Sequence, residues 1–145
     1  MNTAPKKQVA VSFLGTVLDS GFGQGRWQKW RPNVAMNQRQ DFHLDRIELF
    51  YSEKYRDLAD HVKADIQQVS PHTAVNLVPM ELENPWDFSE VYTKLHDWAA
   101  GYAFDTEEET YLTHITTGTH VAQICLFLLV ESRQIPGVLI QTAPP

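Results

Sequence analysis

The stretch YLTHITTGTHVAQICLFLL, from Tyr111 to Leu129, decides how the rest of this chain is interpreted. Its first residues, Tyr111 to Ile115, alternate and include β-branched side chains, which is typical of a β-strand. The small, hydroxyl-rich run Thr116-Thr117-Gly118-Thr119 follows, and then comes an apolar block from Val121 to Val130 that only Gln123 interrupts. The pattern predicts a strand, a tight turn and a helix in immediate succession.

A turn of this composition between a strand and a helix is suited to holding an anion. Backbone N–H groups are exposed in such a turn, Gly118 lets a ligand approach the backbone, and the helix start carries about half a unit of positive charge. Thr116, Thr117 and Thr119 add hydroxyl donors, and His120 could bind phosphate or act as a general acid. The structural alternative is that Thr119 only caps the helix and Gly118 only bends the chain.

Length and composition bound the class of protein. A chain of 145 residues with 43% hydrophobic and 11% aromatic residues indicates one globular domain with a sizeable core. A net charge of −6 argues against a chain that coats nucleic acid along its whole surface. The single cysteine, Cys125, indicates a buried thiol in a reducing compartment. The start of the chain lacks a signal-peptide core, and the longest apolar run, about ten residues, is too short for a membrane span. We therefore expect a soluble cytoplasmic protein without membrane contact.

Segments of strand and helix pattern alternate along the chain. The predicted strands are Gln8–Leu14, Leu44–Tyr51, Ala74–Met80, the one at Tyr111, and Val138–Thr142. The predicted helices are a short one with Pro32 in its first turn, one from Glu53 to about Val69 capped by Ser52, one opened by Asn84-Pro85-Trp86 and running to about Ala103, and one from His120 to near Arg133. This alternation predicts an α/β fold with a Rossmann-like parallel sheet in the order 3-2-1-4-5, helices on both faces, and room for an extra edge strand.

In that strand order, the first and fourth strands flank a switch point, and ligands bind outside the carboxyl ends of the strands at such a point. The loop after the first strand, with Gly15 and Thr16, then lies beside the turn from Thr116 to His120. We therefore predict that the two loops form one ligand site. No G-x-G-x-x-G or Walker A sequence occurs, so neither a dinucleotide site nor an NTP site is predicted.

The distribution of charge favours the same edge of the sheet. Residues 20–40 contain no acidic residue but four basic ones, whereas the acidic run Asp105 to Glu109 enters the fourth strand at its amino end. We select Lys29 and Arg31 as ligand residues from this placement. Three tryptophans fall near the same rim, and cations with aromatic rings suit a nucleotide or single-stranded RNA; they are Trp27, Trp30 and Trp86. The alternative is that tryptophans anchor the core and the charges only solvate the surface.

The helix expected after the turn is apolar on nearly all sides. One face can meet the sheet, and another needs a cover. A twofold dimer through this helix would supply the cover, with interface residues Val121, Ile124, Cys125 and Leu128. Neighbouring helices of the same chain are the alternative.

Signals for catalysis are weak. His114-Ile115-Thr116 matches one half of the two-histidine phosphoesterase pattern H-x-T, but no other histidine has Thr or Ser two residues on. His114 is therefore interpreted as a strand residue packed against its neighbours. The six histidines show no metal-ligand spacing, and no Ser/His/Asp arrangement is evident. We predict no catalytic residue, no metal site and no cofactor.

Four segments are similar to one known family: VAVSFLGTVLD at residues 9–19, WQKWRP at 27–32, NPWDFSEVY at 84–92 and YLTHITTGTHVAQIC at 111–125. They resemble the amino-terminal sensory domain of the RtcR regulators, sigma-54-dependent activators of an RNA repair operon that encodes an RNA ligase and the RNA terminal-phosphate cyclase. That domain belongs to the CARF group, named for the CRISPR-associated Rossmann fold. The resemblance covers essentially the whole chain, residues 1–145.

The resemblance implies a homodimeric, non-enzymatic ligand sensor in a transcriptional activator. Its ligand would be an RNA or tRNA fragment with a 2′,3′-cyclic phosphate end, or a linear or cyclic oligonucleotide such as cyclic oligoadenylate. Ligand binding would release a downstream ATPase domain and a DNA-binding domain, both outside these residues, to act with sigma-54 RNA polymerase on DNA. Carried over by position, the ligand loops are Gly15, Thr16 and nearby Asp19, and Thr116 through His120.

Two alternatives stay open. The first is a ring nuclease or RNA phosphodiesterase acting on cyclic oligoadenylate, in which His120 or Thr116 assists attack by a 2′-hydroxyl. The second is a dimerisation module that binds no small ligand.

Overall fold

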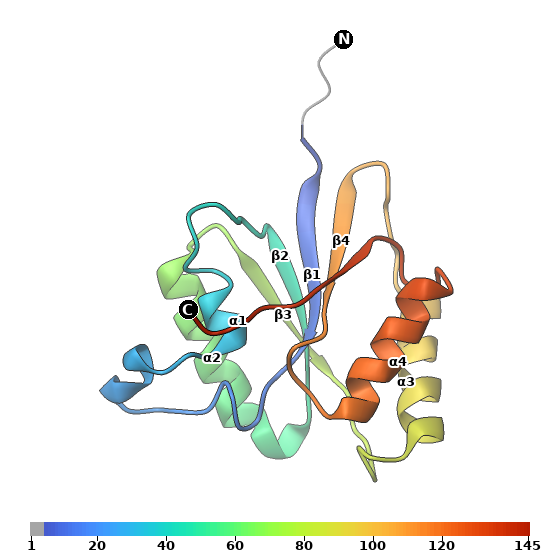
Figure 1. Ribbon diagram of the computed structural model, residues 1–145, viewed down its shortest axis with the longest axis horizontal. Coiled ribbons are helices and arrows are strands. Elements are labelled where there is room, and N and C mark those ends of the chain that lie inside the picture. The colour runs from blue at the N-terminus through green and yellow to red at the C-terminus, as the bar shows by residue number, and fades with distance from the viewer. Residues whose placement is uncertain (1–4) are drawn as a thin grey trace.

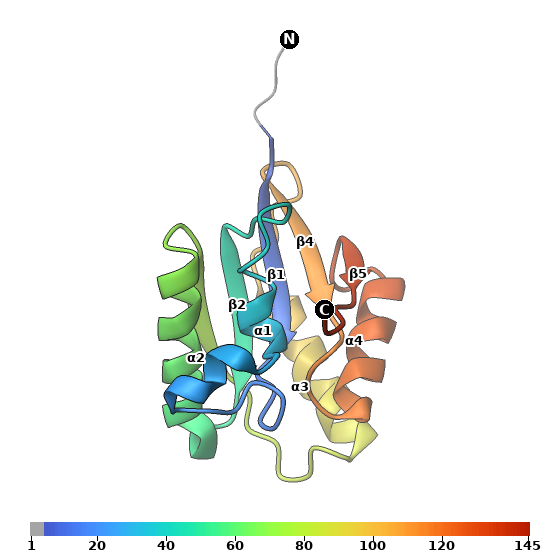
Figure 2. The same cartoon turned by 60° about the vertical axis from the view of Figure 1, so that its left-hand side comes forward.

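The computed structural model describes residues 5–145, which form a five-stranded sheet with helices on both faces (Figures 1 and 2). The strands are β1 (Lys7–Phe13), β2 (Arg46–Tyr51), β3 (Ala74–Pro79), β4 (Glu109–His114) and β5 (Val138–Ile140). All neighbouring strands pair in parallel, in the order β3-β2-β1-β4-β5. The predicted fold class and strand order are confirmed, and the described residues add no further edge strand.

The helices divide between the two faces of the sheet. On one face lie α1 (Pro32–Ala35) and α2 (Arg56–Val69), and on the other α3 (Phe88–Gly101) packs beside α4 (His120–Glu131). Two short 3-10 helices, η1 (Gln24–Gln28) and η2 (Glu53–Tyr55), precede α1 and α2. No helix within residues 5–145 has the length and apolar character that a bilayer crossing requires.

Two predicted helix starts need correction. The helix expected from Glu53 begins as η2 and becomes α-helical only at Arg56, and Ser52 makes no side-chain capping bond. The third long helix begins at Phe88 rather than at Pro85, because Asp87 is its N-cap and accepts the N–H of Glu90. The residues from Pro85 to Asp87 are thereby left in a loop.

The central strand β1 serves two cores because successive side chains point to opposite faces of a sheet. Ala10 and Leu14 pack with α1 and α2, whereas Val11 and Phe13 pack with α3 and α4. All four side chains are buried. A strand covered on both faces must be apolar along its length, which is why this segment was recognisable as central.

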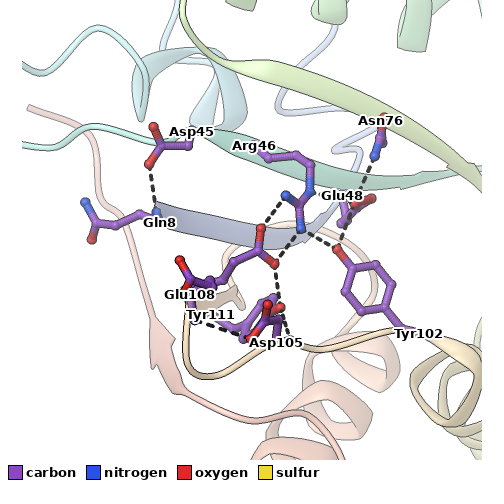
Figure 3. Close-up of polar contacts among 10 residues, drawn as sticks. Gln8, Asp45, Arg46, Glu48, Asn76, Tyr102, Asp105, Glu108 and Tyr111 are labelled. Atoms are coloured by element: carbon purple, nitrogen blue, oxygen red, sulfur yellow. Dashed lines mark hydrogen bonds and ion pairs between the residues drawn. The ribbon is translucent and has the colours of Figure 1, made fainter. Parts of the chain in front are cut away.

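A polar network closes the amino end of the sheet on the side of α3 (Figure 3). Arg46 on β2 donates two hydrogen bonds to Glu109 on β4, at 2.6 and 3.0 Å, and one to the buried Glu48 at 3.2 Å. Tyr102, just after α3, donates to Glu48 and accepts from Arg46. The hydrogen bonds from Arg46 are the main cause that lowers the pKa of Glu109 to about 2. The acidic run therefore lies at the edge opposite the predicted ligand site.

Candidate ligand-binding site

A cavity of about 480 Å³ opens at the carboxyl ends of β1 to β4. Four segments line it: the loop after β1, the junction of β2 with η2, the loop between β3 and α3, and the turn before α4. A cavity of this size suits a small molecule or one unit of a larger ligand. It lies at the edge of the sheet where the strand order predicts a ligand site.

The loop after β1 and the turn before α4 are bonded together, as predicted. The Thr117 hydroxyl donates to the carbonyl of Phe13 at 2.5 Å, and the Thr117 side chain is buried. Its methyl group would lie 3.0 Å from a Cβ built on Gly15, so the contact also requires a glycine at 15. Thr117 therefore joins the loops with its side chain, and only its backbone remains for a ligand.

The turn before α4 requires glycine and leaves several donors unused. Gly118 has a φ of +92°, and a Cβ there would lie 3.1 Å from Cβ of Phe13. Thr119 is the N-cap: its Oγ1 accepts the N–H of Ala122 at 3.0 Å and donates to the carbonyl of Pro85 at 3.0 Å. The structural alternative is thus correct for Thr119. Even so, the backbone N–H groups of residues 118–121 meet no acceptor within residues 5–145.

Residues of the first loop divide into those that line the cavity and those that shape the loop. Gly15 and Thr16 line the cavity, and Thr16 is exposed. Asp19 is fully buried and accepts hydrogen bonds from the N–H of Gly15 at 2.7 Å and from the backbone and side-chain amides of Asn33 at 3.0 and 2.7 Å. Burial raises the pKa of Asp19. Lys29 donates to the carbonyls of Val17 and Ser20, so it holds the same loop from outside the cavity.

The assignment of Arg31 from charge is corrected by its burial. Arg31 is 1% exposed, and its Nη1 lies 2.7 Å from Oδ2 of Asp65 on α2. Its guanidinium also lies 5.0 Å from the centre of the Trp27 ring, whose other neighbour is Arg26 at the same distance. Arg26 pairs with Asp65 as well, at 2.8 Å. These two cations therefore anchor the segment to α2 and are not available to a ligand in the cavity.

His114 is a buried strand residue, as interpreted from the sequence. Its Nδ1 lies 2.9 Å from Oγ of Ser12, and its Nε2 lies 2.9 Å from Oγ1 of Thr142. Because Ser12 donates its one hydroxyl proton to Asn33, at 2.7 Å, the proton of a neutral His114 belongs on Nδ1. Burial lowers the pKa of His114 to about 4. His114 is therefore neutral near pH 7 and does not line the cavity.

Thr116 serves the segment after β5. Its Oγ1 accepts the backbone N–H of Thr142 at 2.9 Å, and it does not line the cavity. In contrast, His120 at the start of α4 lines the cavity and is exposed. In the predicted second loop, residues 117–120 thus border the cavity and Thr116 does not.

The apolar helix α4 is covered in part by its own chain. Cys125 is fully buried, with Sγ 4.0 Å from the carbonyl of Phe88 on α3, and Val121 packs partly into the same core. The assignment of Cys125 to a dimer interface is therefore wrong, because this side of α4 faces α3 and the sheet. Ile124, Phe127 and Leu128 remain exposed, at 51%, 44% and 38%.

Sequence reasoning missed the part of the cavity that the ends of β2 and β3 supply. Lys54 and Tyr55 come from η2, Met80 and Leu82 follow β3, and all line the cavity. Trp86 also lines it, whereas Trp27 and Trp30 do not. The available signal was position, since these residues follow the second and third strands directly. No group of three or more His, Cys, Asp or Glu side chains suited to a metal ion occurs among residues 5–145.

The fold and the cavity at its carboxyl edge define the class first: this is a Rossmann-like α/β domain. The solved structure of Enterococcus italicus Csm6 bound to cyclic hexa-2′-fluoro-hexa-dAMP is similar to it, with a TM-score of 0.72 over 97% of this chain and 35% of that chain. The two sequences are 17% identical, so this likeness concerns the fold.

The family follows from the sequence comparison. The sequence profile of the family RtcR, regulator of RNA terminal phosphate cyclase, matches residues 6–145. The transcriptional regulatory protein RtcR of Escherichia coli (strain K12) is 55% identical over 141 residues, which are 97% of this chain. The chain belongs to the RtcR family. It spans 26% of the length of that relative.

Proposed function

We propose that this chain is the ligand-sensing domain of a transcriptional regulator and that it binds an RNA end or oligonucleotide in the cavity described above. The observation that carries the proposal is the set of N–H groups at residues 118–121 that have no acceptor within residues 5–145, in the turn that borders the cavity with Gly15 and Thr16. Backbone donors at a helix start are well suited to a phosphate group. Membership of the RtcR family supports RNA as the source of that phosphate.

Two classes of ligand are proposed, each of which would place one of its units in the cavity. One is an RNA or tRNA fragment with a 2′,3′-cyclic phosphate end, and the other is a cyclic oligoadenylate, by analogy with the nucleotide bound to Csm6. Either ligand would act without being consumed. It would shift an existing equilibrium between restrained and active arrangements by its difference in affinity for the two.

The segment after β5 offers a route from the cavity to the rest of the protein. Thr142 forms hydrogen bonds with His114, the last residue of β4, and with Thr116 just after it. Residues 117–120, which follow Thr116, border the cavity. A ligand that moves the turn would therefore also move this segment. We propose that an ATPase domain and a DNA-binding domain follow it, and that ligand binding relieves their restraint.

A second copy of this chain is the proposed partner of α4. The exposed side chains of Ile124, Phe127 and Leu128 form a strip on one helix, where water contact with large apolar groups is unfavourable. A twofold contact through one helix covers both copies with the same residues.

Isothermal titration calorimetry with defined RNAs tests the ligand site. The probes are a short RNA ending in a 2′,3′-cyclic phosphate, the same RNA with a 3′-hydroxyl end, and cyclic oligoadenylate. Thr16→Glu places a negative charge in the cavity. Because this charge repels a phosphate group, the affinity should fall by roughly tenfold or more. Thr106→Glu adds the same charge at an exposed site at the amino edge and should leave affinity unchanged.

The outcomes separate the possibilities. Binding of one probe that Thr16→Glu weakens and Thr106→Glu does not supports the site. Equal affinities in both variants would place the ligand elsewhere, and absence of binding to every probe would favour a dimerisation module. Gly118 is a poor test position because its positive φ and its contact with Phe13 make any side chain there a threat to folding.

His120 favours one second candidate function, RNA phosphodiester cleavage. It is exposed at the start of α4 and lines the cavity, so an imidazole stands where a phosphate would bind. Incubation of the purified chain with labelled cyclic oligoadenylate decides the matter. Metal-independent cleavage that His120→Ala removes would establish the enzyme, and intact nucleotide after long incubation would exclude this substrate.

A further inference from the structure

We infer that Trp86 and Lys54 form a nucleotide-binding half of the cavity, in which a nucleobase stacks on Trp86 and its phosphate group lies near Lys54. The inference rests on the proposed function and names the unit of ligand that the cavity takes. Neither residue belongs to the two loops selected from the sequence. They come from the loop before α3 and from η2, on the β2–β3 side of the cavity.

The backbone around Trp86 is held firmly. The Glu90 carboxylate accepts the N–H groups of Glu83 at 2.7 Å and Asn84 at 2.9 Å, and the Asn84 side chain accepts the N–H of Trp86 at 3.1 Å. On the other side, the carbonyl of Pro85 accepts the hydroxyl of Thr119. This loop is thereby tied both to α3 and to the N-cap of α4.

The Trp86 ring itself is left largely unpacked on this firm loop. It is 61% exposed and borders the cavity, and its nearest aromatic neighbour is the ring of His120, with 6.5 Å between centroids. Two of the other three tryptophans pack against neighbours: the Trp27 ring lies 5.0 Å from the guanidinium groups of Arg26 and Arg31, and Trp98 packs on Phe50. An exposed indole on a held loop at a cavity mouth is suited to stacking on a nucleobase.

Lys54 supplies the positive charge in the cavity, which the basic residues between positions 20 and 40 do not supply. It is the one Lys or Arg among residues 5–145 that lines the cavity. Its ammonium group forms no hydrogen bond or ion pair within the described chain and lies 5.4 Å from the centre of the Tyr55 ring. Arg26 and Arg31 are paired with Asp65, and Lys29 is bonded to loop carbonyls. Among residues 5–145, the cavity therefore has one unpaired Lys or Arg to meet a phosphate.

The remaining walls favour a planar base over a bare anion. Apart from one carboxylate, Glu83, the side chains that border the cavity on the side of β1 to β3 are mainly apolar or aromatic: Phe13, Phe50, Tyr51, Met80 and Leu82. A single cation beside an apolar wall matches one base with one phosphate, whereas a run of phosphates calls for several cations. Each subunit would thus take a single nucleotide unit of the ligand.

The test measures the affinity of the 145-residue chain for a short RNA with a 2′,3′-cyclic phosphate end, and for the same RNA lacking its terminal base. Trp86→Ala should weaken binding of the complete RNA on the order of tenfold and leave binding of the abasic RNA unchanged. Trp86→Tyr keeps an aromatic face and should restore most of the affinity. Phe88→Ala is the matched control, because Phe88 is exposed nearby but does not line the cavity.

Lys54 is tested through salt dependence. Lys54→Gln should reduce the slope of log affinity against log salt by about 0.7, the value for one phosphate contact on a single strand. Lys63→Gln on α2, outside the cavity, should leave the slope unchanged. Cyclic oligoadenylate replaces the RNA as probe if it is the nucleotide that the unmodified chain binds.

The outcomes distinguish this inference from the proposed function. Unmodified protein that binds a probe, with Trp86→Ala and Lys54→Gln binding as tightly and with the same salt slope, would overturn the inference and leave the proposed function standing. Unmodified protein that binds no probe would overturn both. Thermal unfolding of each variant shows whether a loss of affinity comes from the site or from the fold.

Discussion

Nε2 of His114 lies 2.9 Å from Oγ1 of Thr142, so the end of β4 is bonded to the segment that follows β5. On its other side His114 donates to Ser12, which donates to Asn33, which in turn donates to Asp19 in the loop after β1. This string of hydrogen bonds, buried from His114 to Asp19, connects the loop after β1 with the half-buried Thr142 in the segment after β5. Both the stability of the domain and its response to a ligand should depend on the string.

The domain should lose stability on mild acidification through His114. Its pKa falls from 6.5 to about 4 on burial, so the unfolded chain binds the proton more readily than the folded one in that interval. Stability therefore rises with pH between about 4 and 6.5, by on the order of 3 kcal/mol across the window. Urea unfolding at pH 7.5 and at pH 5 measures the effect. His114→Gln should reduce this pH dependence, whereas His96→Gln, on a half-exposed side chain, should leave it in place.

A second loss should follow at lower pH, through Glu109. Its pKa is lowered from 4.5 to about 2, so the stability it contributes is present above about 4.5 and is lost as the pH falls toward 2. Glu109→Gln should flatten the stability curve in this lower window only. A flattening near pH 6 in that variant would contradict the separation of the two groups.

Removing the Thr142 hydroxyl should destabilise the domain. Thr142→Val keeps the shape of the side chain but leaves Nε2 of the buried His114 without its donor, at an expected loss of about 1 to 2 kcal/mol. Thr106→Val, at an exposed site, is the control and should be neutral. Hydrogen exchange should also quicken in the segment after β5. Exchange rates that match those of the unmodified chain would mean that the segment is held by other contacts.

Two glycine-to-alanine substitutions should differ sharply in effect. Gly137 has a φ of +101°, and a Cβ there would lie 2.0 Å from the carbonyl oxygen of Tyr111, so Gly137→Ala should destabilise by more than about 2 kcal/mol. A Cβ on Gly25 would meet nothing within 4 Å, and Gly25→Ala should stay within about 0.5 kcal/mol. Denaturant midpoints compare the two. Similar midpoints would show that the turn before β5 rearranges to accept a side chain.

Charge on the exposed strip of α4 should shift the chain toward monomer. Ile124→Glu would bury a carboxylate in the proposed contact between two copies, which is strongly unfavourable. Ala100→Glu, on exposed surface of α3, is the control and should not change the mass. Sedimentation equilibrium measures both. A monomeric unmodified chain would leave the strip to a different partner.

The fold could be predicted from the sequence because the patterns that mark its strands and helices lie within short segments of the chain. Apolar segments such as Gln8–Leu14, separated by Gly, Pro and polar breakers, are enough to place strands and helices in order, and the chirality of crossovers then limits the sheet to few arrangements. The meeting of Gly15 with Thr117 followed from that order alone. Helix starts were predicted less accurately, because capping depends on local hydrogen-bond geometry. Ser52 forms no capping bond before η2, and Asp87 places the start of α3 at Phe88 rather than at Pro85.

Only part of the cavity could be predicted from the sequence, because residues at the ends of several parallel strands line it. Lys54 carries no motif and became a candidate only when β2 and β3 were seen to border the same space. The cavity also selects Trp86 from the three tryptophans that the sequence placed near the rim. In the same way, α4 is apolar on all sides in sequence, but contact with α3 decides that Cys125 is covered and Ile124 is not.

The amino-acid sequence by itself determined the order of strands and helices, the edge of the sheet at which the cavity opens, and the glycine and threonine residues of the turn, because these depend on periodicity and backbone freedom along a short stretch. Only the tertiary structure decided which cations are free. Arg31 pairs with Asp65, which lies 34 residues further along the chain, and both are buried. Lys54 has no hydrogen-bond or ion-pair partner in the part of the chain that the structure describes, and it lines the cavity. A charge in a sequence has no fixed role, because its partner is chosen by packing between segments that are far apart in the chain.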